Sequence, residues 1–169
     1  QNLNFMIDEL IFSLLNLKAE LLGNFNGNIK LLLTNIEHEL IRNGKISFNI
    51  SQNTVNLSEV LFNIVDIGQI NSEINYTEKD GDIIFNSSNS LIIKNKKKFA
   101  KKFQVKSDKV KDINVINFKV DKNINTGIIS IFDIKINQVE YKGKNSGELR
   151  YNIKNSQEMK SLVKKIINN

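Results

Sequence analysis

The pattern of hydrophobic and polar positions divides the chain into a helical beginning, a long β region and a helical end. Over residues 3–22 apolar side chains cover most of a helical circumference, which predicts a helix buried on most sides. After a break rich in glycine and asparagine at 23–27, a second helix is predicted from one apolar stripe: Ile29, Leu32, Leu33, Ile36 and Leu40. Because Asn43 and Gly44 are typical of a helix end, we expect helical structure over residues 1–43.

From Lys45 the hydrophobic pattern changes to strand spacing. Ile46, Phe48 and Ile50 alternate with polar residues, which is typical of a strand with one solvated face. We predict further strands at 60–67, 82–86, 90–94, 113–121, 128–139 and 148–153. Turn residues lie between them, at 80–81, 86–89, 125–127 and 143–147. Since short connections favour antiparallel hairpins over parallel crossovers, residues 44–153 are predicted to form an antiparallel sheet.

The last segment, residues 154–169, returns to a helical pattern. Asn155 and Glu158 have the spacing of a capping box, and one face of the helix predicted at 156–168 is apolar: Met159, Leu162, Val163, Ile166 and Ile167. The expected fold is α+β. In it N-terminal helices pack on an antiparallel sheet, a short C-terminal helix follows, and the whole chain forms one domain.

Composition excludes several kinds of chemistry. The 169 residues contain no cysteine, which excludes disulfides, zinc–thiolate sites and thiol catalysis. The single histidine, His38, lies between Glu37 and Glu39 but off the apolar stripe, where no orienting partner is evident. No phosphate-binding, dinucleotide-binding or hydrolase motif occurs. We therefore expect no enzyme, no cofactor, no metal site and no small-molecule substrate.

The distribution of charge affects the functional interpretation more than any other property of the sequence. The formal net charge is +6, and segment 94–106 alone contains seven lysines and no acid: Lys94, Lys96, Lys97, Lys98, Lys101, Lys102 and Lys106. One interpretation is a surface that binds a polyanion, either nucleic acid, a teichoic-acid-type polymer or an anionic lipid surface. The other is a solvated hairpin whose lysines protect a strand edge while Phe99 and Phe103 point into the core. The lack of arginine in the segment argues against base-specific recognition.

One phrase of the sequence resembles a known family. The phrase IEHELIRNGKI at 36–46, preceded by an apolar helix and followed by strands only, is similar to that of type IV minor pilins and pseudopilins. The resemblance is to those of Gram-positive, A+T-rich bacteria, including the competence pseudopilins. Residues 82–95 and 113–137 resemble a hairpin and a closing strand pair of that family. The break at 23–27 and the C-terminal helix are not general features of it.

The resemblance implies a structural subunit of a type IV pilus or pseudopilus, acting in filament initiation or at the tip, in adhesion or in DNA uptake. Such a protein is displayed outside the cell, is anchored in the membrane before assembly by a segment preceding this chain, and has other pilin-like subunits as partners. The helix predicted at 3–22 would form the subunit interface through Phe5, Leu10, Leu14, Leu17 and Leu21, unless it is core to its own domain. The alternative function is a secreted or anchored surface protein that binds DNA or an anionic cell-wall polymer through segment 94–106.

Overall fold

The computed structural model describes residues 26–34, 36, 41–51, 54–141, 150–153 and 156–168. In this part of the chain nine strands form one antiparallel sheet. Eight of them follow one another in the sheet in chain order: β1 (Gly27–Leu33), β2 (Ile41–Ser51), β3 (Thr54–Ile64), β4 (Gly68–Lys79), β5 (Asp82–Ile93), β6 (Val115–Asn123), β7 (Ile129–Ile136) and β8 (Val139–Glu140). The short strands β8 and β9 (Tyr151–Ile153) pair with opposite ends of β7.

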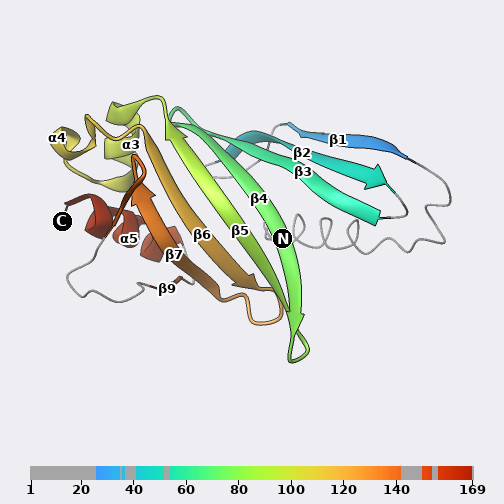
Figure 1. Cartoon of the computed structure of the whole chain (residues 1–169). Helices are drawn as coiled ribbons and strands as arrows, with labels where there is room; N and C mark the ends of the chain where they lie inside the picture. Colours follow the sequence, from blue (N-terminus) through green and yellow to red (C-terminus); the bar gives the residue numbers. More distant parts are fainter. Residues whose placement is uncertain are drawn as a thin grey trace.

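Three helices lie at one end of this sheet (Figure 1). The helices α3 (Lys96–Phe103) and α4 (Ser107–Val110) connect β5 to β6, and α5 (Ser156–Asn168) follows β9. Among the described residues no helix is both long enough and apolar enough to cross a membrane.

Local turn chemistry explains why consecutive strands pair as hairpins. Asp80 and Gly81 join β4 to β5 with φ angles of 53° and 81°, the left-handed conformation that a two-residue hairpin turn requires. Between β6 and β7, Gly127 has a φ of 70°, and the Asn123 side chain accepts a hydrogen bond of 2.9 Å from the Thr126 backbone N–H. The expected antiparallel connections at these turns are therefore confirmed.

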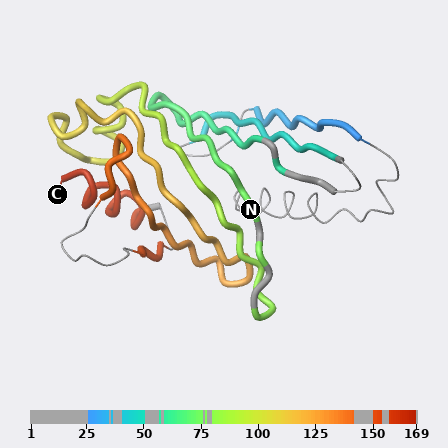
Figure 2. The backbone as a smooth tube through the Cα atoms, viewed as in Figure 1, coloured from blue at the N-terminus to red at the C-terminus, as the bar shows by residue number. Residues whose placement is uncertain are grey.

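The sheet turns away from its original direction between β3 and β4 (Figure 2). Strand β4 pairs with β5 along its whole length, from Gly68 to Lys79, but with β3 only from Gly68 to Ser72. Gly68 makes this junction possible, because a Cβ atom there would lie 1.9 Å from the backbone oxygen of Ile92. The group β1–β3 thus extends away from the group β4–β7.

Two hydrophobic cores result from this arrangement. The helical-end core lies between β4–β7 and the three helices, and among the described residues it has fifteen buried members, including Phe99, Ile116, Ile134 and Leu162. The strand-end core has five, which are Ile46, Phe48, Ile50, Val60 and Phe85. Between the two cores, Ser72 donates a hydrogen bond of 2.6 Å to the Asn89 side chain, and Asn89 donates one of 2.9 Å to the Ser87 hydroxyl. We call Ser72, Ser87 and Asn89 the polar strip.

The α+β class with N-terminal helices on the sheet is wrong. In place of the helix predicted over 29–43, the structure has β1 and the start of β2, so the sheet dominates the described residues. The segment that suggested a helix also fits strand spacing, since Ile29, Leu31 and Leu33 are half-buried while Lys30 and Leu32 are exposed. All seven residues of β1 pair with β2, and this pairing selects the strand period over the helical one. The helix predicted at 3–22 lies outside the described residues.

Other predicted elements had mixed outcomes. The C-terminal helix is confirmed over Ser156–Asn168, and strands are confirmed near 46–50, 60–64, 115–121 and 129–136. Strand β4 was missed, and the supposed turn at 86–89 lies inside β5. Gly44 does not end a helix; it lies within β2, where a Cβ atom would be 2.4 Å from the Phe62 ring.

Candidate functional site

The lysine-rich segment folds as the helix α3, so the hairpin interpretation is wrong. The Asn95 side chain caps its first turn by accepting a hydrogen bond of 3.0 Å from the Lys98 backbone N–H. At the other end Gln104 adopts the left-handed conformation, with a φ of 54°. Phe99 and Phe103, one helical turn apart, are both buried, and their ring centroids are 4.7 Å apart. The expectation that they point into the core is confirmed.

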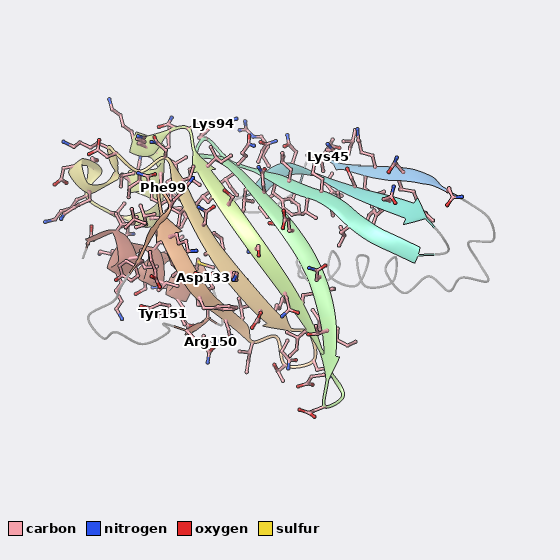
Figure 3. All side chains as sticks on the ribbon, viewed as in Figure 1. Lys45, Lys94, Phe99, Asp133, Arg150 and Tyr151 are labelled. Carbon is pink, nitrogen blue, oxygen red and sulfur yellow. The ribbon has the colours of Figure 1, made fainter. Side chains whose placement is uncertain are left out.

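All seven predicted lysines lie on α3 or within three residues of its ends, but their ammonium groups have different surroundings. Lys94 donates a hydrogen bond of 2.8 Å to the Gln69 side chain. Lys96 donates to the backbone oxygen of Lys111 and, at 2.9 Å, to the Asn114 side chain. Lys98 lies 3.7 Å from a carboxylate oxygen of Asp66. Figure 3 shows Phe99 at the helices, Lys94 at the end of β5 and Lys45 on β2.

Three lysines of the segment are exposed and free of such contacts. The ammonium groups of Lys97, Lys101 and Lys106 make no ion pair or hydrogen bond within the described part of the chain. Lys102 is half-buried and has an interaction of its own. Lys97 and Lys101 lie on α3, which is capped and which its two phenylalanines anchor in the core, and Lys106 lies between α3 and α4.

The neighbouring helices extend this positive surface. Exposed lysines follow at 109 and 111, and residues 94–112 together contain nine lysines against Asp108 and Asp112. Helix α5 packs against both α3 and α4 and adds Lys160, Lys164 and Lys165, opposed by Glu158. We call residues 94–112 together with α5 the lysine-rich end. The sequence prediction located its centre but not its continuation onto α4 and α5, because that depends on how the helices pack.

A cavity of about 150 Å³ lies beneath the lysine-rich end, between the sheet and the helices. Its wall on the sheet side includes Ile70, Leu91 and Phe118, while α3 contributes its two phenylalanines and α5 contributes Met159 and Val163. Every residue that lines it is apolar. Sequence reasoning missed this cavity, because the alternating pattern of a strand does not tell whether its apolar face is fully covered.

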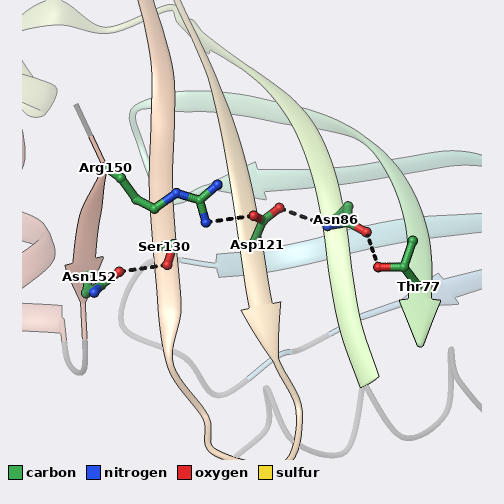
Figure 4. A network of polar contacts seen from close by, with 6 residues as sticks. All are labelled: Thr77, Asn86, Asp121, Ser130, Arg150 and Asn152. Atoms are coloured by element: carbon green, nitrogen blue, oxygen red, sulfur yellow. Dashed lines mark hydrogen bonds and ion pairs between the residues drawn. The ribbon is translucent and has the colours of Figure 1, made fainter. Parts of the chain in front are cut away.

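The opposite face of the sheet carries a polar network (Figure 4). Thr77 donates a hydrogen bond of 3.1 Å to Asn86, whose amide nitrogen donates one of 2.9 Å to Asp121. Arg150 binds the other carboxylate oxygen of Asp121 at 2.9 Å and lies 4.3 Å from the centroid of the Phe132 ring. Because both oxygens of Asp121 have partners, one on β5 and the other on the residue before β9, this network connects neighbouring segments of the sheet.

Two groups near these surfaces have shifted pKa values. A hydrogen bond from Lys119 at 2.9 Å, together with the charges of Lys119 and Lys135, holds the pKa of Asp133 below its ordinary value of 3.8. Burial raises the pKa of Tyr151, and the nearby Tyr141 adds to this shift. The Lys165 ammonium lies 5.3 Å from the centroid of the Tyr151 ring.

The remaining predicted site residues are not placed by the structure. His38 and the proposed interface residues Phe5, Leu10, Leu14, Leu17 and Leu21 lie outside the described residues. In the part of the chain that is described, no three acidic or histidine side chains converge as metal ligands would.

Comparisons with protein-family models, with curated proteins and with solved structures found no match to this chain. The lysine-rich end and the cavity beneath it are therefore the features from which we infer function.

Proposed function

We propose that this chain is a non-catalytic binding protein that attaches to a phosphate-bearing polyanion through its lysine-rich end. The observation that supports this most directly is the set of free, exposed ammonium groups at Lys97 and Lys101 on an anchored helix and at Lys106 just beyond its end. Residues 94–112 have a formal charge of +7, whereas the whole chain has +6, so the positive charge is concentrated on one surface. Such a concentration attracts polyanions and speeds their association.

The chemistry of this surface favours backbone contact over sequence reading. Lysine interacts with phosphate as a point charge, whereas base recognition relies mainly on the bidentate geometry of arginine. Residues 94–112 contain no arginine, and both of their phenylalanines are buried, so neither bidentate base contacts nor base stacking is offered there. We therefore expect binding that depends on charge density and falls steeply with salt.

The test is retention on random-sequence duplex DNA and on an anionic polyphosphate polymer, measured as a function of salt concentration. The variant Lys97→Ala/Lys101→Ala/Lys106→Ala removes the three free ammonium groups and leaves the buried face of α3 intact. If each lysine contacts one phosphate, the slope of log K against log salt on DNA falls by roughly three in this variant.

The control variant is Lys30→Ala/Lys122→Ala/Lys135→Ala, which changes the net charge equally at positions on β1, β6 and β7. We expect it to keep most of the affinity, because these lysines lie outside the lysine-rich end. Equal losses in the two variants would show that total charge alone drives binding. No retention of the unaltered chain at about 50 mM salt on either polymer would refute the proposal.

The pilus or pseudopilus function remains a separate prediction. Its sequence phrase at 36–46 was interpreted as a helix leading into the first strand, whereas residues 41–46 already belong to β2. Nothing among the described contacts favours pilin-like partners over others, and a place at the cell surface likewise stays a prediction. Co-purification of pilin-like subunits with the full-length protein would support this function.

A further inference from the structure

The cavity beneath the lysine-rich end is suited to hydrocarbon. All of its lining residues are apolar, and no polar surface faces it. A polar group placed inside would lose its hydrogen bonds to water without replacement, which is unfavourable. A cavity of about 150 Å³ is close in size to one that stays dry and accepts a benzene-sized guest. Its natural occupant is therefore a short length of hydrocarbon.

The cavity is reached from solvent at its rim. Ile70, Leu91 and Phe118 on the sheet are only half-buried, and so are Met159 and Val163 on α5. Along the inner face of β4 and β5 the apolar surface ends at the polar strip, because the pair Ser72 and Asn89 lies next to the pair Ile70 and Leu91 at strand spacing. The apolar surface for a hydrocarbon chain thus ends at the polar strip, and Met159 and Val163 of α5 form part of the half-buried rim.

The charge next to the rim is positive. Lys160 and Lys164 on α5 each follow one residue after Met159 and Val163, so the two lysines form the adjacent row on the same helix. Lys164 is exposed, and Glu158 is the only acidic residue of α5. A ligand whose hydrocarbon occupies the cavity would place its polar head beside this row, where an anion is favoured.

We propose that this cavity binds the hydrocarbon chain of a single-chain anionic amphiphile of the fatty-acid type, with its carboxylate beside Lys160 and Lys164. This site shares Lys160 and Lys164 with the lysine-rich end, but its hydrocarbon chain is held by apolar contacts with the sheet and α5. The free lysines at 97, 101 and 106 are not needed for it.

The experiment measures dissociation constants for octanoate, decanoate and dodecanoate by calorimetry below their micelle concentrations. We expect the affinity to rise by up to about fourfold for each CH₂ group that enters the cavity, and to level off once the cavity is filled. Decanol, which lacks the charge, is expected to bind more weakly than decanoate at low salt, and this difference is expected to shrink as salt is added.

Variants at the rim and on α5 show where the ligand binds. Val163→Phe adds bulk at the rim and is expected to weaken decanoate binding by about tenfold or more, whereas Val139→Phe makes the same change on β8, where the side chain is 72% exposed, and is expected to have no effect. Lys160→Gln/Lys164→Gln is expected to weaken decanoate binding and leave decanol binding unchanged. Thermal unfolding of each variant verifies that it is folded.

The proposal is overturned if none of the three acids binds, or if folded Val163→Phe binds decanoate as tightly as the unaltered chain. The outcome is separate from that of the polyanion test. Val163→Phe is expected to keep its retention on DNA, and Lys97→Ala/Lys101→Ala/Lys106→Ala is expected to keep its affinity for decanoate.

Discussion

The two ends of the sheet bury their hydrophobic side chains under different kinds of cover. At the helical end, helices from two separate segments of the chain close the inner face of β4–β7, and fifteen of the described residues are buried there. At the strand end, β1–β3 and the far part of β5 supply five buried residues, and Phe48 and Phe85 are the largest of them. The helical end also has the lysine-rich end and the apolar cavity.

This difference indicates how stability and the proposed binding surfaces are distributed between the two ends of the sheet. The larger core supports the helix that exposes the free lysines, so the proposed binding surfaces belong to the end with more buried hydrophobic area. The polar strip interrupts the apolar inner face between the two cores. We therefore expect the two ends to respond differently to substitutions.

The largest effect is expected at the junction that both ends share. In Gly68→Ala the new Cβ atom would lie 1.9 Å from the Ile92 backbone oxygen, so β4 would have to move away from β5. We expect the free energy of unfolding to fall by about 4 kcal/mol or more, measured by urea denaturation. Gly81→Ala is the comparison, because a Cβ there meets no atom within 4 Å and only the φ of 81° opposes it. An equal loss in both variants would exclude backbone collision as the cause.

Matched phenylalanine deletions separate the two cores. Phe99→Ala and Phe48→Ala each remove a side chain with no exposed surface, one from each core. Each substitution is expected to lower the free energy of unfolding of the core that loses the ring by about 3–5 kcal/mol. By amide hydrogen exchange, Phe48→Ala should lower protection mainly in β1–β3, whereas Phe99→Ala should lower it throughout α3, β6 and β7. Uniform loss of protection in both variants would mean that the ends unfold as one unit.

The smallest effect concerns an ion cluster on the outer face of the helical end. Since the pKa of Asp133 is lowered in the folded state, its ionisation adds stability above its ordinary pKa of 3.8, and this stability is lost as the pH falls through the lower folded value. Asp133→Asn, which keeps a residue suited to the φ of 50° at this position, should remove that part of the acid sensitivity.

Thermal unfolding between about pH 7 and pH 2 measures this contribution. Glu59→Gln is the control at the strand end, because it removes one carboxylate that pairs with Lys45. If Asp133→Asn retains the full acid sensitivity of the unaltered chain, the cluster around Asp133 does not contribute to stability.

Much of the local structure was predictable because short segments determine it. Asp80 and Gly81 formed the expected turn, since few residues adopt left-handed angles as readily. The C-terminal helix was predicted over its full length from its apolar stripe. Lysines 94–106 were recognised as a unit, because charge is read directly from the sequence.

Other elements were decided by partners far along the chain. Asn86 and Asn89 suggested a turn, but within β5 their side chains bond Asp121 and Ser72 of the adjacent strands, which makes polar residues compatible with a strand interior. The helix α3 was missed because a strand hairpin also satisfied the lysine pattern. Only the burial of Phe99 and Phe103 on one helical face, against the sheet, distinguishes the two.

The sequence by itself therefore determined the hairpin turns, the C-terminal helix and the concentration of positive charge. Tertiary structure decided that residues 27–33 form a strand, that the lysines lie on a helix, and that an apolar cavity lies beneath them. The physical reason is that turn and charge preferences act within a few residues. By contrast, a hydrophobic pattern that fits both a helix and a strand adopts one of them only because of the surface against which it packs.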